Sequence, residues 1–207
     1  MSFEEHLDRW QALHGGTDPR RAPLVRRWLR VVHAVGRPVA RTRVHPDVLT
    51  VLSVVAAVGV LAVPAPVGAL LVVGSALLDA LDGAVALLQD RVTRVGAVLD
   101  GVADRVCDLL FVTALVLAGA PIWLGIACIA GVLLLEGTRL VTGRVLTLTV
   151  AERPTRVLAC ALGLVSVPTA GLAVLGAALL VGLVQLLPAL RRTRGTARTV
   201  RPGRAAR

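Results

Sequence analysis

Long apolar stretches separated by short connections constrain the fold of this chain more than any other feature. A helix that crosses a bilayer needs roughly 20 predominantly apolar residues. Six stretches of the 207-residue chain approach that length, and they are residues 47–63, 65–88, 95–119, 121–142, 154–170 and 172–190. Their apolar residues run continuously instead of alternating with polar ones, which favours helices over strands. The sequence therefore predicts an all-α polytopic membrane protein with six transmembrane helices.

The order of polar and apolar segments predicts three parts. Residues 1–46 form a cytoplasmic N-terminal segment, residues 47–190 a six-helix membrane domain, and residues 191–207 a basic cytoplasmic tail. The first ten residues, MSFEEHLDRW, have no apolar core, so we expect no cleaved signal peptide. We expect the polar residues 1–20 to be mobile.

An interfacial amphipathic helix is predicted directly before the first apolar stretch. The apolar residues that recur at helical spacing along residues 21–38 are Leu24, Trp28, Val31 and Val35. The arginines of this segment lie off that face, a pattern typical of a helix that lies in the membrane interface. A soluble amphipathic helix shows the same spacing, but the position directly before a membrane span favours the interfacial interpretation.

The distribution of arginine predicts the orientation in the membrane. All 23 basic residues are arginine, and all but one lie in the N-terminal segment, in or beside the connections near 88–95 and 142–153, or in the tail. The connections near 64–66, 118–122 and 168–171 carry none. The positive-inside rule therefore predicts an integral protein of the cell's inner (plasma) membrane with both termini in the cytoplasm. A net charge of +10 also suits nucleic acid, but orientation and attraction to anionic lipid explain it better, so we expect no nucleic-acid partner.

The cysteines and histidines offer no metal-binding pattern. Cys107, Cys128 and Cys160 lie singly in separate apolar stretches, where we expect them to be small buried side chains. The four histidines lie at irregular spacing in the N-terminal segment. We therefore assign neither residue type to a metal site.

Aspartates gather where the second apolar stretch ends and the third begins. Asp79 and Asp82 are three residues apart, and Asp100, Asp104 and Asp108 follow each other at intervals of four. Each set therefore shares one face of a helix. The short connection QDRVTR makes the two helices antiparallel neighbours, so their carboxylates point at one another.

The energetic cost of these carboxylates predicts a hydrated metal site. An aspartate near the middle of a span costs roughly 2.5–3.5 kcal/mol, whereas each Leu or Val contributes only about 0.3–0.6 kcal/mol. The carboxylates must therefore face a polar cavity near the cytoplasmic surface, and their repulsion requires cations. Oxygen ligands alone favour Mg²⁺ or Mn²⁺, as one or two ions. A proton or cation pathway, or a salt-bridge cluster with Arg91, Arg94 and Arg105, would also explain the pattern.

The spacing of these residues resembles the motif of the CDP-alcohol phosphatidyltransferase family (class I). The matching positions are Asp79-x-x-Asp82-Gly83-x-x-Ala86 and Gly96-x-x-x-Asp100-x-x-x-Asp104. Upstream, RVHPDVLT (43–50) resembles the family's entry to its first span, with Asp47 in place of the usual Asn. The resemblance covers about residues 40–190.

The resemblance implies a reaction and a set of roles. A phosphatidyl group would pass from CDP-diacylglycerol to an alcohol with release of CMP, as a step of phospholipid biosynthesis. Asp79, Asp82, Asp100 and Asp104 would hold the metal, and Asp104 would also be the general base that takes the proton of the acceptor hydroxyl. The residues that would contact the CDP donor are Asp47, Thr50, Gly83, Ala86 and Gly96. A homodimer is implied by the resemblance alone.

One position departs from the family pattern. The family usually has Arg directly after the motif's Ala, where this chain has Leu87. That Arg is implied to hold the CDP part, so a catalytically impaired member is an alternative, with Arg91 or Arg94 as substitutes from the connection. A non-enzymatic transporter is a second alternative, although neither broken helices nor matching halves are visible. An aspartate-rich membrane prenyltransferase is a third, but its acidic motifs lie far apart in sequence.

Arginines on the predicted cytoplasmic side suggest a phosphorylated acceptor. They are Arg139, Arg153 and Arg156, and guanidinium groups match phosphate oxygens well. The Ala-Glu-Arg-x-x-Arg run that starts at Ala151 resembles the branch that makes phosphatidylinositol phosphate, which implies inositol phosphate as acceptor. Glycerol phosphate is the other phosphorylated acceptor that we consider. The arginines could instead only anchor the loop. Glu136 could line the cavity or pair with Arg139, and we leave it unassigned.

Overall fold

The computed structural model describes residues 1–13, 18–21, 23–141 and 149–199, and within these ranges it is all-helical. The eight α-helices of this part are α1 (Phe3–Leu13), α2 (Pro23–Arg41), α3 (Pro46–Gly59), α4 (Ala65–Leu88), α5 (Arg94–Leu117), α6 (Ile122–Val141), α7 (Arg153–Val165) and α8 (Pro168–Thr199). Two 3₁₀ turns, Pro19–Arg21 and Val60–Ala62, precede α2 and follow α3.

Proline and capping residues set where the helices begin. Pro46 opens α3, and the His45 side chain before it accepts a hydrogen bond from the main-chain N–H of Asp47. Thr93 caps α5 by accepting from the N–H of Gly96 at 2.9 Å. Proline suits the first helical turn because its missing N–H has no partner there in any case. The sequence thus places the start of α5 directly after the arginine-bearing connection.

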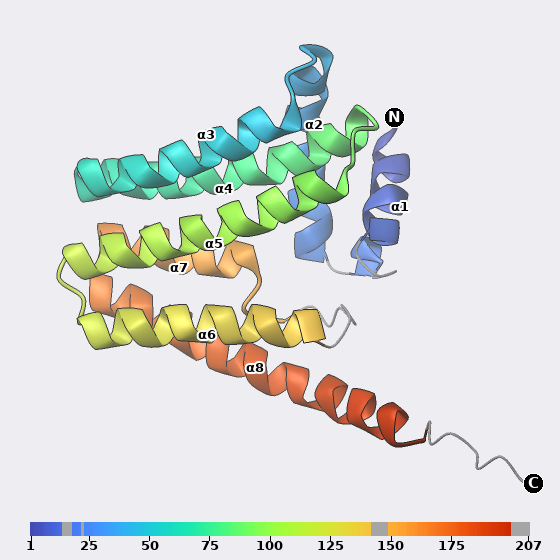
Figure 1. Cartoon of the computed structure of the whole chain (residues 1–207). Helices are drawn as coiled ribbons and strands as arrows, with labels where there is room; N and C mark the ends of the chain where they lie inside the picture. Colours follow the sequence, from blue (N-terminus) through green and yellow to red (C-terminus); the bar gives the residue numbers. More distant parts are fainter. Residues whose placement is uncertain (14–17, 22, 142–148, 200–207) are drawn as a thin grey trace, which may run out of the picture.

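The six helices α3 to α8 pack side by side, and α2 runs across one end of this bundle with α1 next to it (Figure 1). The axes of α2 and α3 differ by 119°. Within the bundle, α3 packs against α4 and α5, α4 also packs against α7, and α8 packs against α6 and α7. The predicted neighbours α4 and α5 meet in fewer places, because α3 bridges them along much of their length.

The core is apolar and includes one very close helix contact. Its largest fully buried side chains include Phe111, Leu115 and Leu172. A Cβ atom built on Gly171 of α8 would lie 2.6 Å from the Cα of Gly163 in α7. Such an approach is possible only because both positions lack side chains.

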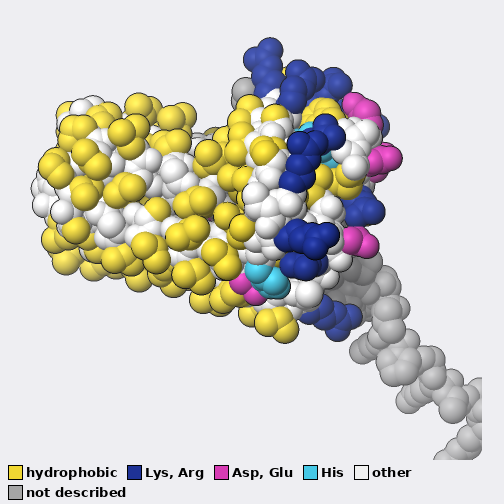
Figure 2. Space-filling view, turned by 90° about the horizontal axis from the view of Figure 1, so that it is seen from above, with side chains coloured by type: hydrophobic (Ala, Val, Ile, Leu, Met, Phe, Trp, Pro, Cys, Tyr) yellow, Lys and Arg dark blue, Asp and Glu magenta, His cyan; other side chains and the backbone are white. Residues whose placement is uncertain are grey.

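The outer surface of the bundle is apolar, while charged side chains gather at one end of the molecule (Figure 2). Three helices of the described chain are long and apolar enough to cross a membrane, namely Ala65–Leu88, Ile122–Arg139 and Pro168–Leu187. Counting the bent pair α2 and α3 as one span gives four. The helix α5 carries too many charges to be included, and α7 has only 13 residues. These are the features of a membrane protein, and the predicted number of six spans stays a prediction.

Two details of the predicted organisation are wrong. The N-terminal residues predicted to be mobile form the helix α1, because Leu7 and His6 are buried against the rest of the molecule. The last helix break lies at Ser166 and Val167 and not near 171, because Pro168 starts α8. The predicted boundary between membrane domain and tail at residue 190 falls inside the backbone of α8.

The segment predicted to form an interfacial helix is helical, as α2, which extends to Arg41, and its place in the membrane interface stays a prediction. The predicted apolar residues Trp28, Val31 and Val35 are exposed on its surface. A different apolar stripe, which includes Leu29 and Val32, is buried against the bundle. The helix therefore has one face for the protein and another available to lipid.

Candidate metal and substrate site

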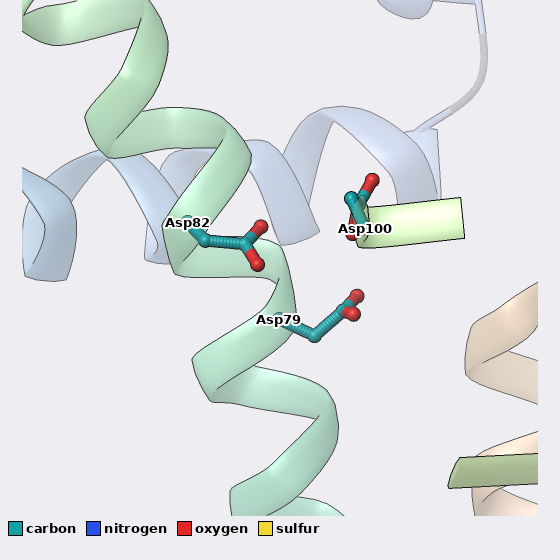
Figure 3. Close-up of side chains that lie close together, drawn as sticks. All are labelled: Asp79, Asp82 and Asp100. Atoms are coloured by element: carbon teal, nitrogen blue, oxygen red, sulfur yellow. The ribbon is translucent and has the colours of Figure 1, made fainter. Parts of the chain in front are cut away.

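Three of the predicted metal-binding carboxylates meet between α4 and α5. Asp79 and Asp82 extend from one face of α4 toward Asp100 near the start of α5 (Figure 3). One oxygen atom from each of the three carboxylates lies within 4.8 Å of the others. The spacing of three in α4 thus places two carboxylates on one side of the site, and the antiparallel α5 supplies the third.

Helix α3 contributes two polar side chains next to the site. The hydroxyl of Thr50 donates a hydrogen bond of 2.5 Å to the carboxylate of Asp82, and both side chains are buried. Asp47, one turn earlier, lies beside the start of α5, since a Cβ on Gly96 would be 3.9 Å from its carboxylate oxygen. The predicted donor-contacting residues of the first span therefore lie next to the aspartates.

An arginine from a distant segment completes the cluster. Arg153, at the start of α7, forms an ion pair of 2.8 Å with Asp79 and a second ion pair with Asp104. Asp104 also pairs with its neighbour Arg105 at 3.1 Å. Asp104 is thus held by two guanidinium groups and does not belong to the three carboxylates that lie within 4.8 Å of one another.

The donor set suits a divalent cation. The arginines Arg153 and Arg105 can compensate only half the charge that the four carboxylates carry when ionised, and the repulsion among them then favours a further cation. Oxygen atoms that bind one Mg²⁺ ion at about 2.1 Å lie roughly 3–4 Å apart, so small side-chain movements would bring Asp79, Asp82 and Asp100 into place. Carboxylate oxygen is the ligand that Mg²⁺ and Mn²⁺ prefer.

Open space and a third guanidinium group lie along the same part of α4. A Cβ on Gly83 would have no atom within 4 Å, so the helix surface is free beside the carboxylates. Leu87, by contrast, is buried with 7% exposure. From α1, Arg9 donates to the main-chain oxygen of Leu87 at 3.3 Å and pairs with Asp90 at 3.1 Å. A positive charge therefore stands near position 87 although the residue itself is apolar.

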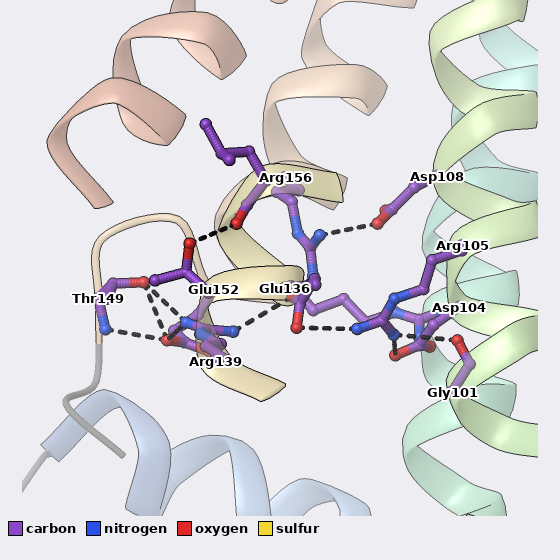
Figure 4. Close-up of polar contacts among 12 residues, drawn as sticks. Gly101, Asp104, Arg105, Asp108, Glu136, Arg139, Thr149, Glu152 and Arg156 are labelled. Atoms are coloured by element: carbon purple, nitrogen blue, oxygen red, sulfur yellow. Dashed lines mark hydrogen bonds and ion pairs between the residues drawn. The ribbon is translucent and has the colours of Figure 1, made fainter. Parts of the chain in front are cut away.

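A chain of ion pairs links the site to α6 and α7 (Figure 4). Glu136 lies at its centre and contacts three arginines, at 2.8 Å from Arg105, 3.2 Å from Arg139 and 3.4 Å from Arg156. The pairing of Glu136 with Arg139, one of the two roles considered from sequence, is confirmed. Because Arg105 also touches Asp104, Glu136 connects the predicted base to both remaining predicted acceptor arginines.

Further carboxylates hold these two arginines. Arg156 is buried, with 4% exposure, and pairs with Asp108 at 2.8 Å. Arg139 donates to Glu152 at 2.5 Å and to Thr149 at 2.9 Å. Of the three predicted acceptor arginines, only Arg153 reaches the aspartate cluster directly.

Sequence reasoning missed the roles of Asp108 and Glu152, and it considered Arg105 only as an alternative salt-bridge partner of the aspartates. The intervals of four from Asp100 to Asp108 did signal one shared helix face. Their partners lie on α6, α7 and the residues before α7, and no local pattern links segments that far apart. The predicted alternative of salt bridges with Arg91, Arg94 and Arg105 is present in part among the ion pairs of the described residues. Arg105 pairs with Asp104, whereas Arg91 and Arg94 take no part, and Arg153 pairs with Asp79 instead. The prediction of buried, single cysteines is confirmed.

The chain is similar to known proteins over most of its membrane part. The sequence model of the CDP-alcohol phosphatidyltransferase family matches residues 43–187. An archaetidylinositol phosphate synthase of Aeropyrum pernix is 37% identical over 116 residues, which cover 53% of this chain and 59% of that protein. A bifunctional IPC transferase and DIPP synthase of Aquifex aeolicus is 48% identical over 60 residues, or 29% of this chain and 14% of that protein. The matches thus span less than two thirds of these relatives' own lengths.

A solved structure has a similar fold. The Mycobacterium tuberculosis phosphatidylinositol phosphate synthase, crystallised with CDP-DAG bound, superposes with a TM-score of 0.60 at 22% sequence identity. The superposition covers 86% of this chain and 98% of that one. At this level of identity the likeness concerns the fold.

Proposed function

Since the chain belongs to the CDP-alcohol phosphatidyltransferase family, we propose that it transfers a phosphatidyl group from CDP-diacylglycerol to a phosphorylated alcohol. The single observation that carries this proposal is the meeting of Asp79, Asp82 and Asp100 within 4.8 Å, beside open helix surface at Gly83. An anionic diphosphate lipid can approach there, because the glycine leaves space next to the carboxylates.

The bonding changes are those of an alcohol exchange at phosphorus. The acceptor hydroxyl oxygen attacks the phosphorus that carries the diacylglycerol, and the bond from that phosphorus to the CMP oxygen breaks. Asp104 takes the hydroxyl proton, and such assistance is typically worth roughly 10²–10⁴-fold in rate. The contacts of Asp104 with Arg153 and Arg105 keep its carboxylate oriented.

One or two Mg²⁺ or Mn²⁺ ions would be held by Asp79, Asp82 and Asp100. Asp104 would be a further ligand at the edge of this metal site. When bound, a divalent ion supplies charge neutralisation for the diphosphate and the leaving CMP. Thr50 fixes the rotamer of Asp82 through its hydrogen bond. The remaining donor contacts that we propose are Asp47, Gly83, Ala86 and Gly96.

The acceptor site that we propose is built on Arg153, with Arg139 and Arg156 behind it. Arg153 touches both Asp79 and Asp104, so a phosphate bound to it would lie close to the base. Arg139 and Arg156 form ion pairs with carboxylates. Their proposed role is to supply positive charge to one side of the acceptor site. Inositol phosphate and glycerol phosphate are the acceptors that this chemistry favours.

The membrane arrangement is part of the proposal. Six spans, with both termini in the cytoplasm, would place the aspartates at headgroup depth, where lipid tails stay in the bilayer and the polar acceptor arrives from water. A homodimer, carried over from the family, is proposed with it.

The experiment that tests the proposal measures CMP release by purified protein in lipid micelles. CDP-diacylglycerol and Mg²⁺ or Mn²⁺ are supplied with inositol phosphate, glycerol phosphate, inositol, serine or phosphatidylglycerol. We expect CMP release that depends on a phosphorylated acceptor and on the metal, and that is lost in Asp104→Asn. A chelator should abolish the activity in the same way.

If folded protein releases no CMP with any of these acceptors, the proposal is contradicted. That result would favour the alternative of a catalytically impaired family member, in which Leu87 replaces the usual Arg. Activity with a non-phosphorylated alcohol would keep the reaction and overturn the acceptor class. Binding of CDP-diacylglycerol with no metal dependence would instead favour a non-enzymatic lipid-binding protein or transporter.

A further inference from the structure

A groove outside the aspartate site runs along the exposed side of α2. It has a volume of about 570 Å³. Three arginines of one helix face line it, namely Arg30, Arg37 and Arg41, together with Phe3, His33, Ala34 and Pro38. Spacings of three, four and seven residues place the members from α2 on one stripe of that helix. The groove thus combines guanidinium groups with an apolar floor.

The arginines of the groove are not engaged by any carboxylate of the described residues. None of the ion pairs found between described residues involves Arg30, Arg37 or Arg41, although Arg20 and Arg26 nearby pair with Glu4. Arg30 instead lies over the ring of Phe3, at 5.7 Å from its centre. Clustered like charges without a counter-ion attract an anionic ligand.

The position of the groove on α2 indicates what that ligand is. One face of α2 is buried against the bundle through Leu29 and Val32, and a second exposes Trp28, Val31 and Val35. At 100° per residue, the arginine stripe occupies the third face and borders the exposed apolar one. The helix also lies across the end of the bundle, where the charged surface meets the apolar surface (Figures 1 and 2).

We propose that this groove binds the phosphate headgroup of an anionic phospholipid, with the acyl chains along the exposed apolar face of α2. A free phosphate would satisfy the arginines but would leave Trp28, Val31 and Val35 uncovered, so the lipid is the better fit. The site is separate from the aspartate cluster and independent of the catalytic proposal. It makes α2 a lipid-selective anchor for the N-terminal segment.

Quenching of Trp28 fluorescence by brominated lipids tests the proposal at the apolar face of α2, where the acyl chains would lie. The full-length protein, with Trp10→Phe and Trp123→Phe so that Trp28 is its one tryptophan, is reconstituted in bilayers that mix phosphatidylcholine with brominated phosphatidylglycerol or brominated phosphatidylcholine. A basic side chain near the surface typically strengthens binding of anionic lipid about fivefold. We expect phosphatidylglycerol to be preferred at Trp28 by about tenfold or more.

Two double variants of equal charge distinguish the effect of the groove arginines from the effect of the overall positive charge. Arg37→Gln with Arg41→Gln should reduce the preference to about fivefold or less, because only Arg30 of the three groove arginines remains. Arg21→Gln with Arg27→Gln removes the same charge from the same segment outside the groove and should retain it. Thermal melting in detergent confirms that each variant is folded.

Three results would overturn the proposal. One is the absence of any preference in the parent protein, and another is an equal preference in the two double variants. The third is loss of the preference when inorganic phosphate is added, but not when chloride of equal ionic strength is added, because the groove would then bind a soluble anion.

Discussion

At the scale of single residues, the site depends on how carboxylates are divided among partners. Asp79, Asp82 and Asp100 lie close enough together for one ion, while Asp104 is held by Arg153 and Arg105. This division separates the proposed metal ligands from the proposed base. It also makes the two roles distinguishable by substitution, because a base can be removed while a metal still binds.

Substitution of Asp100 by Asn should weaken metal binding more than substitution of Asp104. We expect Asp100→Asn to reduce the affinity for Mn²⁺ by at least about tenfold, because it removes one carboxylate from the group of three. Electron paramagnetic resonance of free Mn²⁺ measures this without any substrate. Asp104→Asn should have the smaller effect, and an equal loss in both variants would place Asp104 among the metal ligands.

Glu136 should matter for stability far more than an exposed carboxylate. Its side chain is 15% exposed and contacts three arginines, so Glu136→Gln leaves buried positive charge uncompensated. Breaking such buried pairs typically costs about 3–5 kcal/mol. Thermal melting in detergent should show a large decrease. The control is Asp90→Asn, which breaks an ion pair whose carboxylate is 88% exposed and should change little.

At the scale of helices, close packing and an ordered N-terminus decide the arrangement. Gly163 and Gly171 let α7 and α8 approach each other, and α7 in turn presents Arg153 to the aspartates. At the other end, α1 packs on α2 and α4 through buried residues that include His6. The rings of His6 and His33 lie edge to face at 5.1 Å, and the buried Nδ1 atoms of both have no hydrogen-bond partner among the described residues.

A methyl group at position 171 should destabilise the pair α7 and α8. The Cβ of Gly171→Ala would lie 2.6 Å from the Cα of Gly163 and 2.9 Å from the main-chain oxygen of Ala159, and backbone cannot move aside cheaply. Overpacking of this kind typically costs about 1–3 kcal/mol. In Gly74→Ala the new methyl meets no atom within 4 Å, so its melting temperature should not decrease. Equal melting of the two variants would show that the helices can separate freely.

Acid should loosen the N-terminal helix. Burial, with a smaller contribution from His33, lowers the pKa of His6 from 6.5 to about 4. The docked helix therefore disfavours the protonated ring. Its stability is complete above about pH 6.5, decreases by up to about 3 kcal/mol as the pH falls to about 4, and changes no further below that.

Hydrogen exchange of residues 3–13 measures this loosening. We expect faster exchange at pH 4.5 than at pH 7 after correction for the intrinsic pH dependence. In His6→Phe most of that difference should disappear, and a variant that loosens as much as the parent would assign the effect to other groups.

At the scale of the whole molecule, surface character divides the protein into an apolar body and a charged end. The exposed side chains of the bundle are largely apolar, and the charged residues gather where α1 and α2 lie (Figure 2). The arginine-bearing connection between α4 and α5 and the start of α7 lie at this same end (Figure 1). This polarity fits the proposal of a membrane protein whose aspartate site faces one aqueous side.

Cysteine labelling tests the proposed six-span topology. The native cysteines Cys107, Cys128 and Cys160 are buried and should react slowly. With an impermeant maleimide added outside intact cells, Ala118→Cys, in the turn after α5, should be labelled. Ser2→Cys and Ala205→Cys should be labelled only after lysis. Labelling of both ends of the chain from opposite sides would show an odd number of spans.

The sequence by itself determined most of the helices and the spacing of the residues that we propose to carry the chemistry. Apolar runs, prolines and the Thr93 cap are local signals, and the intervals from Asp79 to Asp104 place carboxylates on shared faces without any tertiary contact. The sequence predicted helix boundaries less well where packing decides the role of a residue. Gly171 resembles a helix break in the sequence, but it lies inside α8 and allows the close contact with α7. The order of α1 was missed because its few apolar residues gain stability only by docking.

Only the tertiary structure decided how the charges are shared. Arg153 meets Asp79 and Asp104 across at least 49 residues of chain, and Glu136 gathers arginines from α5, α6 and α7. Such pairs depend on helix contacts whose energies are set by the shapes of several elements at once, and no residue spacing records them. The same holds for the groove on α2. Its arginine-bearing face can be told apart as an exposed binding surface only when the structure shows that a different face of the helix is buried against the bundle.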